Sequence, residues 1–157
     1  MIWISLATGW AIPDVPKYVL FNDEQMIQMA YDCAGEGAVE NKYICEMPVE
    51  ELTNNPAIIK PIALFDTRDH VIMLPDDFDE KKIRDQSILL HELVHYMQWK
   101  LELYPKNYTC RQQTEFEAYD LQEKFLAERG LDLHKVIKIG PLLRFMVSHC
   151  DGGAWGR

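Results

Sequence analysis

Residues 83–101 of this 157-residue chain read IRDQSILLHELVHYMQWKL, and they decide which fold can form around them. Apolar residues recur there at intervals of three and four, the spacing of one side of an α-helix. That apolar row consists of Ile83, Leu90, Leu93, Val94, Met97 and Leu101. A polar row on a neighbouring side consists of Ser87, His91, His95 and Gln98. We therefore predict a long helix from about Asp79 that Pro105 ends, with its apolar row in the core.

The stretch upstream of this helix has the pattern of strands. Residues 62–65 and 71–74 are apolar and flank the polar residues 66–69, which predicts a β-hairpin, and residues 43–45 are a further short strand candidate. Two helical pieces are expected before the hairpin. Asn22 is placed to cap one that ends near Gly35, and residues 49–54 fit a single helical turn.

The stretch downstream returns to a helical pattern. We expect a helix from about Gln112 to Arg129, stopped by Gly130, and then one or two shorter helices divided at residues 140–141. The order of helix, strands and helices predicts an α+β fold in a single domain over residues 1–157. In this fold a small mixed sheet packs on the long helix that begins near Asp79. The helix from about Gln112 to Arg129 and short C-terminal helices follow it.

His91-Glu92-Leu93-Val94-His95 is the motif that carries chemistry. Residues four apart on a helix differ by only about 40° around its axis, so both imidazoles leave the same face one turn apart. There, two ring nitrogens can bind one Zn²⁺ ion. Glu92 lies at the border of that face, where its carboxylate can reach a metal-bound water without being a ligand. The motif therefore predicts a zinc centre in which His91 and His95 are ligands and Glu92 is the general base.

A catalytic zinc centre usually has a third protein ligand, and the next helix offers one. Glu115, Ala118, Tyr119 and Gln122 share a face of it, and the small residue at 118 would let the two helices approach closely. We predict Glu115 as the third ligand. Glu117 is the alternative, although its position in the helix points it towards water.

Composition and charge restrict the classes of partner. The chain has 25 acidic and 16 basic residues, a net charge of −9, and no Lys/Arg-rich run. A nucleic-acid partner is therefore not expected, because it requires a concentrated basic face. No stretch approaches the roughly 20 apolar residues of a transmembrane helix. The apolar residues 1–11 are read as a packed arm or first strand rather than the remnant of an export segment.

The four cysteines, Cys33, Cys45, Cys110 and Cys150, leave the compartment open. Three full pairings are possible, among them one that joins Cys33 to Cys45 and Cys110 to Cys150. Paired cysteines indicate an oxidising, extracytoplasmic location such as the periplasm or the secreted fraction, whereas free thiols fit a cytoplasmic protein.

The motif and the residues after it resemble the gluzincins, zinc peptidases whose third ligand is a Glu in an ExxA pattern about twenty residues after the second His. The short chain is similar to their minimal single-domain forms, the minigluzincins, over roughly residues 70 to 125. The resemblance implies that His91, His95 and Glu115 bind zinc, that Glu92 is the general base and acid, and that the substrate is a peptide or protein. It also implies that residues 71–74 form the edge strand that pairs with an extended substrate.

The sequence departs from the gluzincin pattern at Tyr119, where many members have an Asp that orients a ligand His; Asp120 is its neighbour. Either Tyr119 or a carbonyl group then takes the orienting role, or the affinity for the metal is weaker. The donor to the oxyanion is left open among His149, Tyr104, Tyr108 and Tyr119. Two other functions compete: a non-catalytic or latent zinc-binding domain of peptidase fold, and a deformylase-like hydrolase with Cys45 as third ligand.

Overall fold

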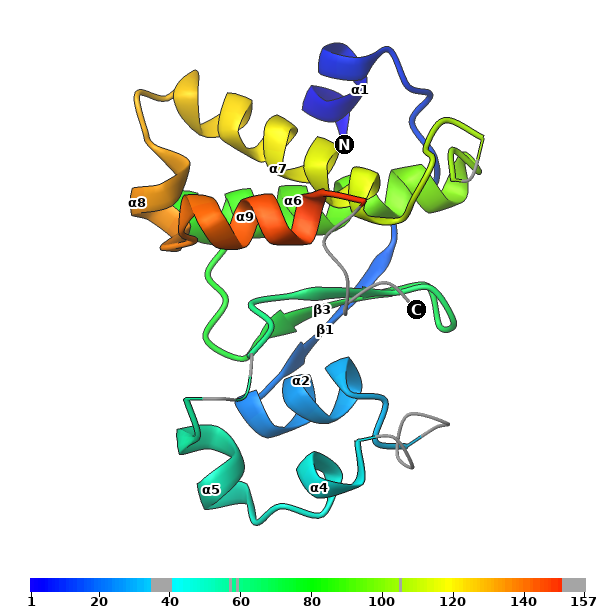
Figure 1. Cartoon of the computed structure of the whole chain (residues 1–157). Coiled ribbons are helices and arrows are strands. Elements are labelled where there is room, and N and C mark those ends of the chain that lie inside the picture. Colours follow the sequence, from blue (N-terminus) through cyan, green and yellow to red (C-terminus); the bar gives the residue numbers. More distant parts are fainter. Residues whose placement is uncertain (35–40, 57, 59, 105, 151–157) are drawn as a thin grey trace.

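The computed structural model describes residues 1–34, 41–56, 58, 60–104 and 106–150, which form an α+β fold (Figure 1). A three-stranded sheet lies between two groups of helices. The strands are β1 (Lys17–Phe21), β2 (Leu64–Asp66) and β3 (Val71–Pro75). On one side lie α1 (Ile2–Thr8), α6 (Ile83–Lys100), α7 (Gln112–Ala127), α8 (Leu133–Ile137) and α9 (Pro141–Ser148). On the other lie α2 (Asp23–Ala30), α4 (Lys42–Cys45) and α5 (Val49–Asn54).

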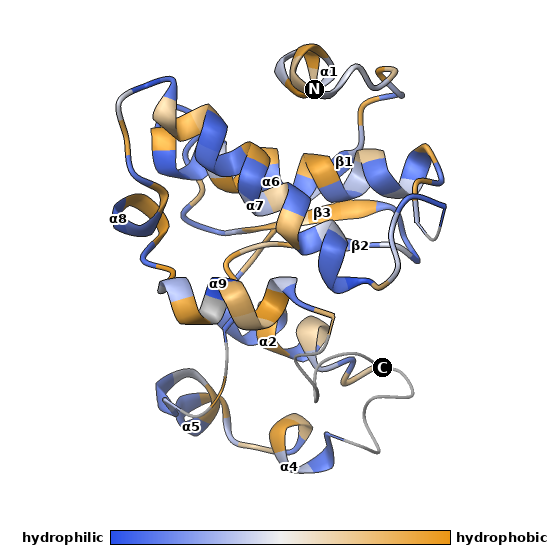
Figure 2. Ribbon diagram, turned by 45° about the horizontal axis from the view of Figure 1, so that its top comes forward, coloured by the Kyte–Doolittle hydropathy of each residue, from blue (hydrophilic) through white to orange (hydrophobic). Residues whose placement is uncertain are grey.

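The sheet has the order β1-β3-β2, so β3 is its central strand. The predicted hairpin is confirmed, because β2 pairs with β3 in the antiparallel sense. The expectation that residues 71–74 form an edge strand is wrong, since β1 pairs in parallel along the other side of β3. Figure 2 shows β3 coloured as hydrophobic, in keeping with its buried centre. The two edges of the sheet are β1 and β2.

The side of α6 that packs into the core was predicted correctly, but the predicted helix was too long at its C-terminal end. Leu74, Val94, Met97 and Leu126 are fully buried in the main core, which α6 and α7 share with the sheet. The helix ends at Lys100 because Glu102 adopts a left-handed φ of 51°. The N–H groups of Glu102 and Leu103 then bond back to the carbonyls of Trp99 and Gln98, which closes the last turn.

The helices on the far side of the sheet form a small second core of Ile27, Met47, Leu52 and Ile58. Asn22 caps α2 as predicted, in a capping box with Gln25. The turn over Val49–Asn54 is also helical. The strand predicted over residues 43–45 is wrong: these residues belong to helix α4, which places Ile44 against the second core.

The N-terminal residues form the packed arm that was expected, but as a helix and not as a strand. Ile4 of α1 is buried, and the Trp3 ring N–H donates to Glu128 Oε2 at 2.8 Å. Two residues after Glu128, Gly130 follows the end of α7 with a φ of 71°, the stop that was predicted. No helix in the described ranges is long and apolar enough to cross a membrane.

Two disulfides cross-link the chain, Cys33–Cys45 and Cys110–Cys150. All four cysteines are therefore paired, and the alternative of free thiols is wrong. The first bond joins the end of α2 to α4, and the second joins the residues just before α7 to those just after α9. Such bonds form and persist in oxidising compartments, which indicates an extracytoplasmic environment.

Candidate metal centre

The helices α6 and α7 lie side by side (Figure 1), and buried residues of the polar row of α6 contact α7. Ala118 is 0% exposed and supplies the close approach expected of a small residue. Next to it the side-chain amide of Gln122 donates to Ser87 Oγ at 3.3 Å. At the other end of the interface, Gln98 donates to the carbonyl oxygen of Thr114 at 3.1 Å. The two helices therefore run antiparallel, and the start of α7 lies beside the middle and end of α6.

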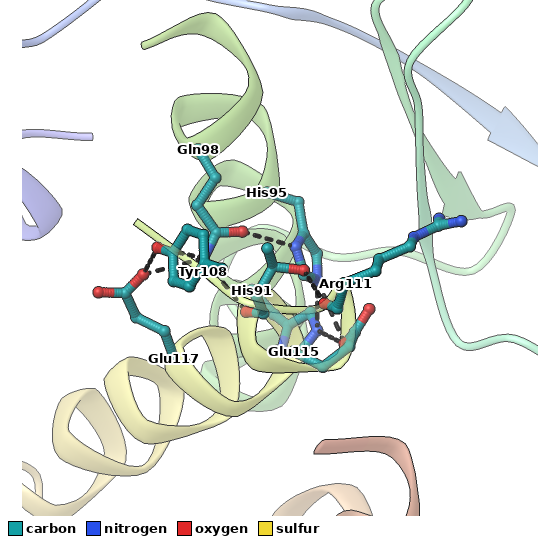
Figure 3. Close-up of polar contacts among 8 residues, drawn as sticks. His91, His95, Gln98, Tyr108, Arg111, Glu115 and Glu117 are labelled. Atoms are coloured by element: carbon teal, nitrogen blue, oxygen red, sulfur yellow. Dashed lines mark hydrogen bonds and ion pairs between the residues drawn. The ribbon is translucent and has the colours of Figure 1, made fainter. Parts of the chain in front are cut away.

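Three ligand atoms converge at this contact, one from each residue that the sequence predicted (Figure 3). The Nε2 atoms of His91 and His95 lie 3.1 Å apart. Glu115 Oε2 lies 3.3 Å from each of them. The His91 and His95 side chains are 10% and 15% exposed, and that of Glu115 is 32% exposed. The group is thus mostly buried and opens to solvent on the side of Glu115.

The spacing of these atoms fits a small divalent metal ion. Ligand atoms at 2.0–2.1 Å from a tetrahedral ion lie about 3.3 Å from one another, which follows from the geometry of the tetrahedron. The observed separations are 3.1 to 3.3 Å. Two imidazole nitrogens and a carboxylate oxygen also form a donor set that first-row divalent ions accept. His91, His95 and Glu115 could therefore hold a metal ion and leave one position open.

His95 and Glu115 of this group shift each other's pKa values. Burial lowers the pKa of His95, but the nearby Glu115 carboxylate outweighs it and raises that pKa to about 9. Burial likewise opposes ionisation of Glu115, but His95 and His91 hold its pKa well below the usual range. The metal-free centre is therefore an ion pair between a carboxylate and an imidazolium at neutral pH.

Glu92 is 7% exposed and lies where α6 borders β2. Burial raises the pKa of its carboxyl group, and the neighbouring His91 and His95 only partly offset this. The backbone N–H of Phe65 in β2 donates to the same carboxylate and favours its ionised form. Glu92 is not among the three converging ligand residues. The structure thus places the Glu92 carboxylate beside the metal-binding group and outside the ligand set, where the motif put it, and burial raises its pKa.

The partner that orients His95 was missed from the sequence. His95 Nδ1 lies 3.0 Å from the side-chain oxygen of Gln98, which stands in the same polar row of α6. Its position three residues after His95 was the available signal, because side chains three apart on a helix are neighbours. His91 Nδ1 has no hydrogen-bond partner among the described residues. Tyr119 instead packs its ring on that of His91, with centroids 4.4 Å apart.

The alternatives for the third ligand are resolved by contacts. Glu117 does not face water as expected, and it does not join the histidines. Its carboxylate accepts hydrogen bonds from the Tyr108 hydroxyl and, at 3.1 Å, from the Gln98 amide. Cys45 is bonded to Cys33, so it has no thiolate to offer a metal. The deformylase-like ligand set is therefore wrong, and Glu115 is the carboxylate that completes the group.

Of the four candidate oxyanion donors, Tyr119 is the one that the structure places against a ligand. Burial, and then the Glu115 and Glu92 carboxylates, raise its pKa, so its hydroxyl remains protonated at neutral pH. The Tyr108 hydroxyl already donates to Glu117. His149 stacks on Phe145 at 3.7 Å and contacts its carbonyl oxygen at 2.9 Å, and Tyr104 is exposed.

Fold and site together define an α+β domain with a two-histidine, one-carboxylate metal-binding group between its two longest described helices. Over residues 42–140 the sequence matches the family described as a domain of unknown function (DUF6647), and the chain belongs to this family. The matched residues include both histidines, Glu92 and Glu115, whereas α1, β1 and α2 precede them. No curated protein and no solved structure matches the sequence.

Proposed function

We propose that this protein is a zinc-dependent peptidase of the gluzincin type. The observation that carries the proposal is the convergence of His91, His95 and Glu115 with the buried carboxylate of Glu92 beside them. A purely structural metal site has no use for a further carboxylate that is not a ligand and whose pKa is raised. A hydrolase requires one, because a general base works best when its pKa lies near the operating pH.

The chemistry divides between the metal and the side chains around it. Zinc, when bound, lowers the pKa of water and polarises the carbonyl of the scissile bond. Glu92 accepts the proton of the attacking water and then delivers it to the leaving amine. Tyr119, whose ring packs on that of His91, is the residue that we assign to donate a hydrogen bond to the oxygen on which negative charge develops.

The edge strand β2 supports a peptide as the substrate. Its inner edge pairs with β3, and its outer edge carries no further strand in the described part of the chain. The N–H of Phe65 points to Glu92, so this edge borders the site. An extended peptide added to β2 would place its backbone next to the metal-binding group. We therefore assign to β2 the substrate-binding role that the sequence suggested for residues 71–74.

The compartment proposed for this activity is the periplasm or the secreted fraction. Its support is the pair of disulfides, which an oxidising environment maintains.

Comparing wild type with Glu92→Gln tests the proposal. Zinc content and hydrolysis of a broad peptide library are measured for both proteins. We expect both to bind one zinc ion per chain and only the wild type to cleave peptides. If both bind zinc and neither cleaves any peptide, the non-catalytic or latent zinc-binding domain is the better account. Failure of the wild type to bind zinc removes both accounts.

A further inference from the structure

Gln98 is a buried amide, 2% exposed, between the two helices that carry the metal-binding group. Its oxygen lies 3.0 Å from Nδ1 of His95 on its own helix. Its nitrogen lies 3.1 Å from the Thr114 carbonyl oxygen and 3.1 Å from Glu117 Oε2, both on α7 (Figure 3). The same nitrogen is 3.4 Å from the Tyr108 hydroxyl. Every polar atom of this side chain is therefore engaged.

These neighbours fix which way the amide points. The Thr114 carbonyl and the Glu117 carboxylate are acceptors, so only the NH₂ end of Gln98 can face them. Its oxygen must then face His95 and accept a hydrogen bond from the Nδ1–H group. A flipped amide would set its oxygen against the Thr114 carbonyl oxygen and the Glu117 carboxylate, and both would lose the hydrogen bond from the Gln98 amide, which is costly.

The orientation of the amide determines that of the imidazole. A proton held on Nδ1 leaves the lone pair of neutral His95 on Nε2, the atom that lies 3.3 Å from Glu115 Oε2. Thr114 and Glu117 flank Glu115 in α7, so the same amide also contacts the turn that carries the third ligand. The Tyr108 hydroxyl donates to Glu117 and holds that carboxylate in place.

We propose that Gln98 is the positioning residue of the metal centre. It holds His95 in the tautomer and ring orientation that present Nε2 to a metal ion, and it ties that ring to the turn of Glu115. The inference rests on the zinc site of the proposed function and is independent of peptide hydrolysis. Removing such a partner of a ligand His typically weakens metal affinity about 10–100-fold.

Gln122 offers a matched control within the same interface. It is also a buried glutamine, 1% exposed, but its hydrogen bond goes to Ser87 Oγ and not to a ligand. Gln98→Met and Gln122→Met make the same chemical change at two equally buried positions. Gln98→Asn is a third variant, which keeps a buried amide but is one methylene too short to reach both His95 and α7.

The experiment titrates the metal-free full chain with Zn²⁺ against a chromophoric chelator. We expect Gln98→Met to bind zinc about 10–100-fold more weakly than wild type, and Gln122→Met to bind it about as tightly as wild type. Proton NMR of the zinc-loaded proteins supplies a second readout. The Nδ1 proton of His95 should exchange slowly with solvent in wild type and Gln122→Met, and quickly in Gln98→Met.

The outcomes separate the positioning role from the zinc site itself. If wild type binds zinc and the two methionine variants bind it equally tightly, the positioning role is overturned and the zinc site stands. If wild type binds no zinc, both are overturned. Should Gln98→Met fail to fold, Gln98→Asn takes its place, and wild-type affinity in that variant contradicts the role.

Discussion

At the scale of single residues, His95 and Glu115 lie together in the site. Their side chains are 3.3 Å apart and carry opposite charges in the metal-free protein. The pKa of His95 is raised to about 9 although burial alone would lower it. A zinc ion therefore has to replace the proton on His95, because only a neutral imidazole can be a ligand.

This replacement predicts how zinc affinity depends on pH. A group whose pKa is raised holds its proton up to that value, so His95 competes with zinc below about pH 9. We expect binding to release about one proton from His95 at pH 7.5, and the affinity to rise about tenfold per pH unit until pH 9. Calorimetry in buffers of different ionisation enthalpy measures the released proton. An affinity that stays constant between pH 7.5 and 8.5 contradicts the ion pair.

The pKa of Glu92 is raised because burial in the folded protein makes its ionised form less favourable. A carboxyl group whose pKa is raised on folding opposes folding once the pH exceeds the unfolded value, and it ceases to do so at low pH. Glu92→Gln removes that charge while keeping an acceptor for the Phe65 N–H. We expect the metal-free variant to be more stable than wild type by about 1 kcal/mol at pH 7. Denaturant unfolding at pH 7 and at pH 4 tests this, since the difference should shrink at pH 4; a variant less stable at pH 7 contradicts it.

At the scale of elements, the site depends on how closely α6 and α7 pack. Ala118 is fully buried at the contact, one turn after Glu115. Ala118→Leu should cost about 1–3 kcal/mol through overpacking and should weaken zinc binding by moving Glu115 away from the histidines. Ala127→Leu, at the exposed end of the same helix, is the control and should change neither quantity much. Unchanged zinc affinity in Ala118→Leu would mean that the close approach does not set the ligand spacing.

The disulfide that closes the longer loop should stabilise the chain more, because the loss of loop-closure entropy grows with the logarithm of loop length. Cys33–Cys45 joins residues 12 apart and Cys110–Cys150 residues 40 apart. The loss of loop-closure entropy then predicts costs of about 3 and about 4 kcal/mol for replacing each pair by alanines. Denaturant unfolding of the two double variants measures this order. A smaller cost for the longer loop would indicate that strain or residual structure outweighs the entropy.

The elements also show what the sequence could predict. The helices α2, α6 and α7 were predictable because helical periodicity, the N-cap of Asn22 before α2 and the stop at Gly130 after α7 are local properties. β1 was not, because its residues are largely exposed and lack the alternation of a half-buried strand. Its pairing with β3 is a long-range contact that the sequence does not reveal, so nothing in the sequence corrected the edge position that the gluzincin resemblance implied for residues 71–74. Residues 43–45 form too short an apolar run to distinguish a strand from a helix.

Within the site, too, local patterns could be predicted from the sequence and long-range contacts could not. His91, Glu92, His95 and Glu115 could be predicted, because spacing along two helices is enough to bring them to one place. The spacing of Gln98 places it near His95, but the orientation of its amide could not be predicted, because the Thr114 carbonyl and Glu117 of the other helix determine it.

At the scale of the whole molecule, we expect the two helical groups around the small sheet to hold one zinc ion between α6 and α7. A crystal structure of the zinc-loaded full chain, with anomalous data at the zinc edge, tests this most directly. We predict a single strong anomalous peak within about 2.0–2.2 Å of His91 Nε2, His95 Nε2 and a Glu115 carboxylate oxygen, with Glu92 outside the ligand set. A peak elsewhere, or one that lacks Glu115 among its ligands, would contradict the account.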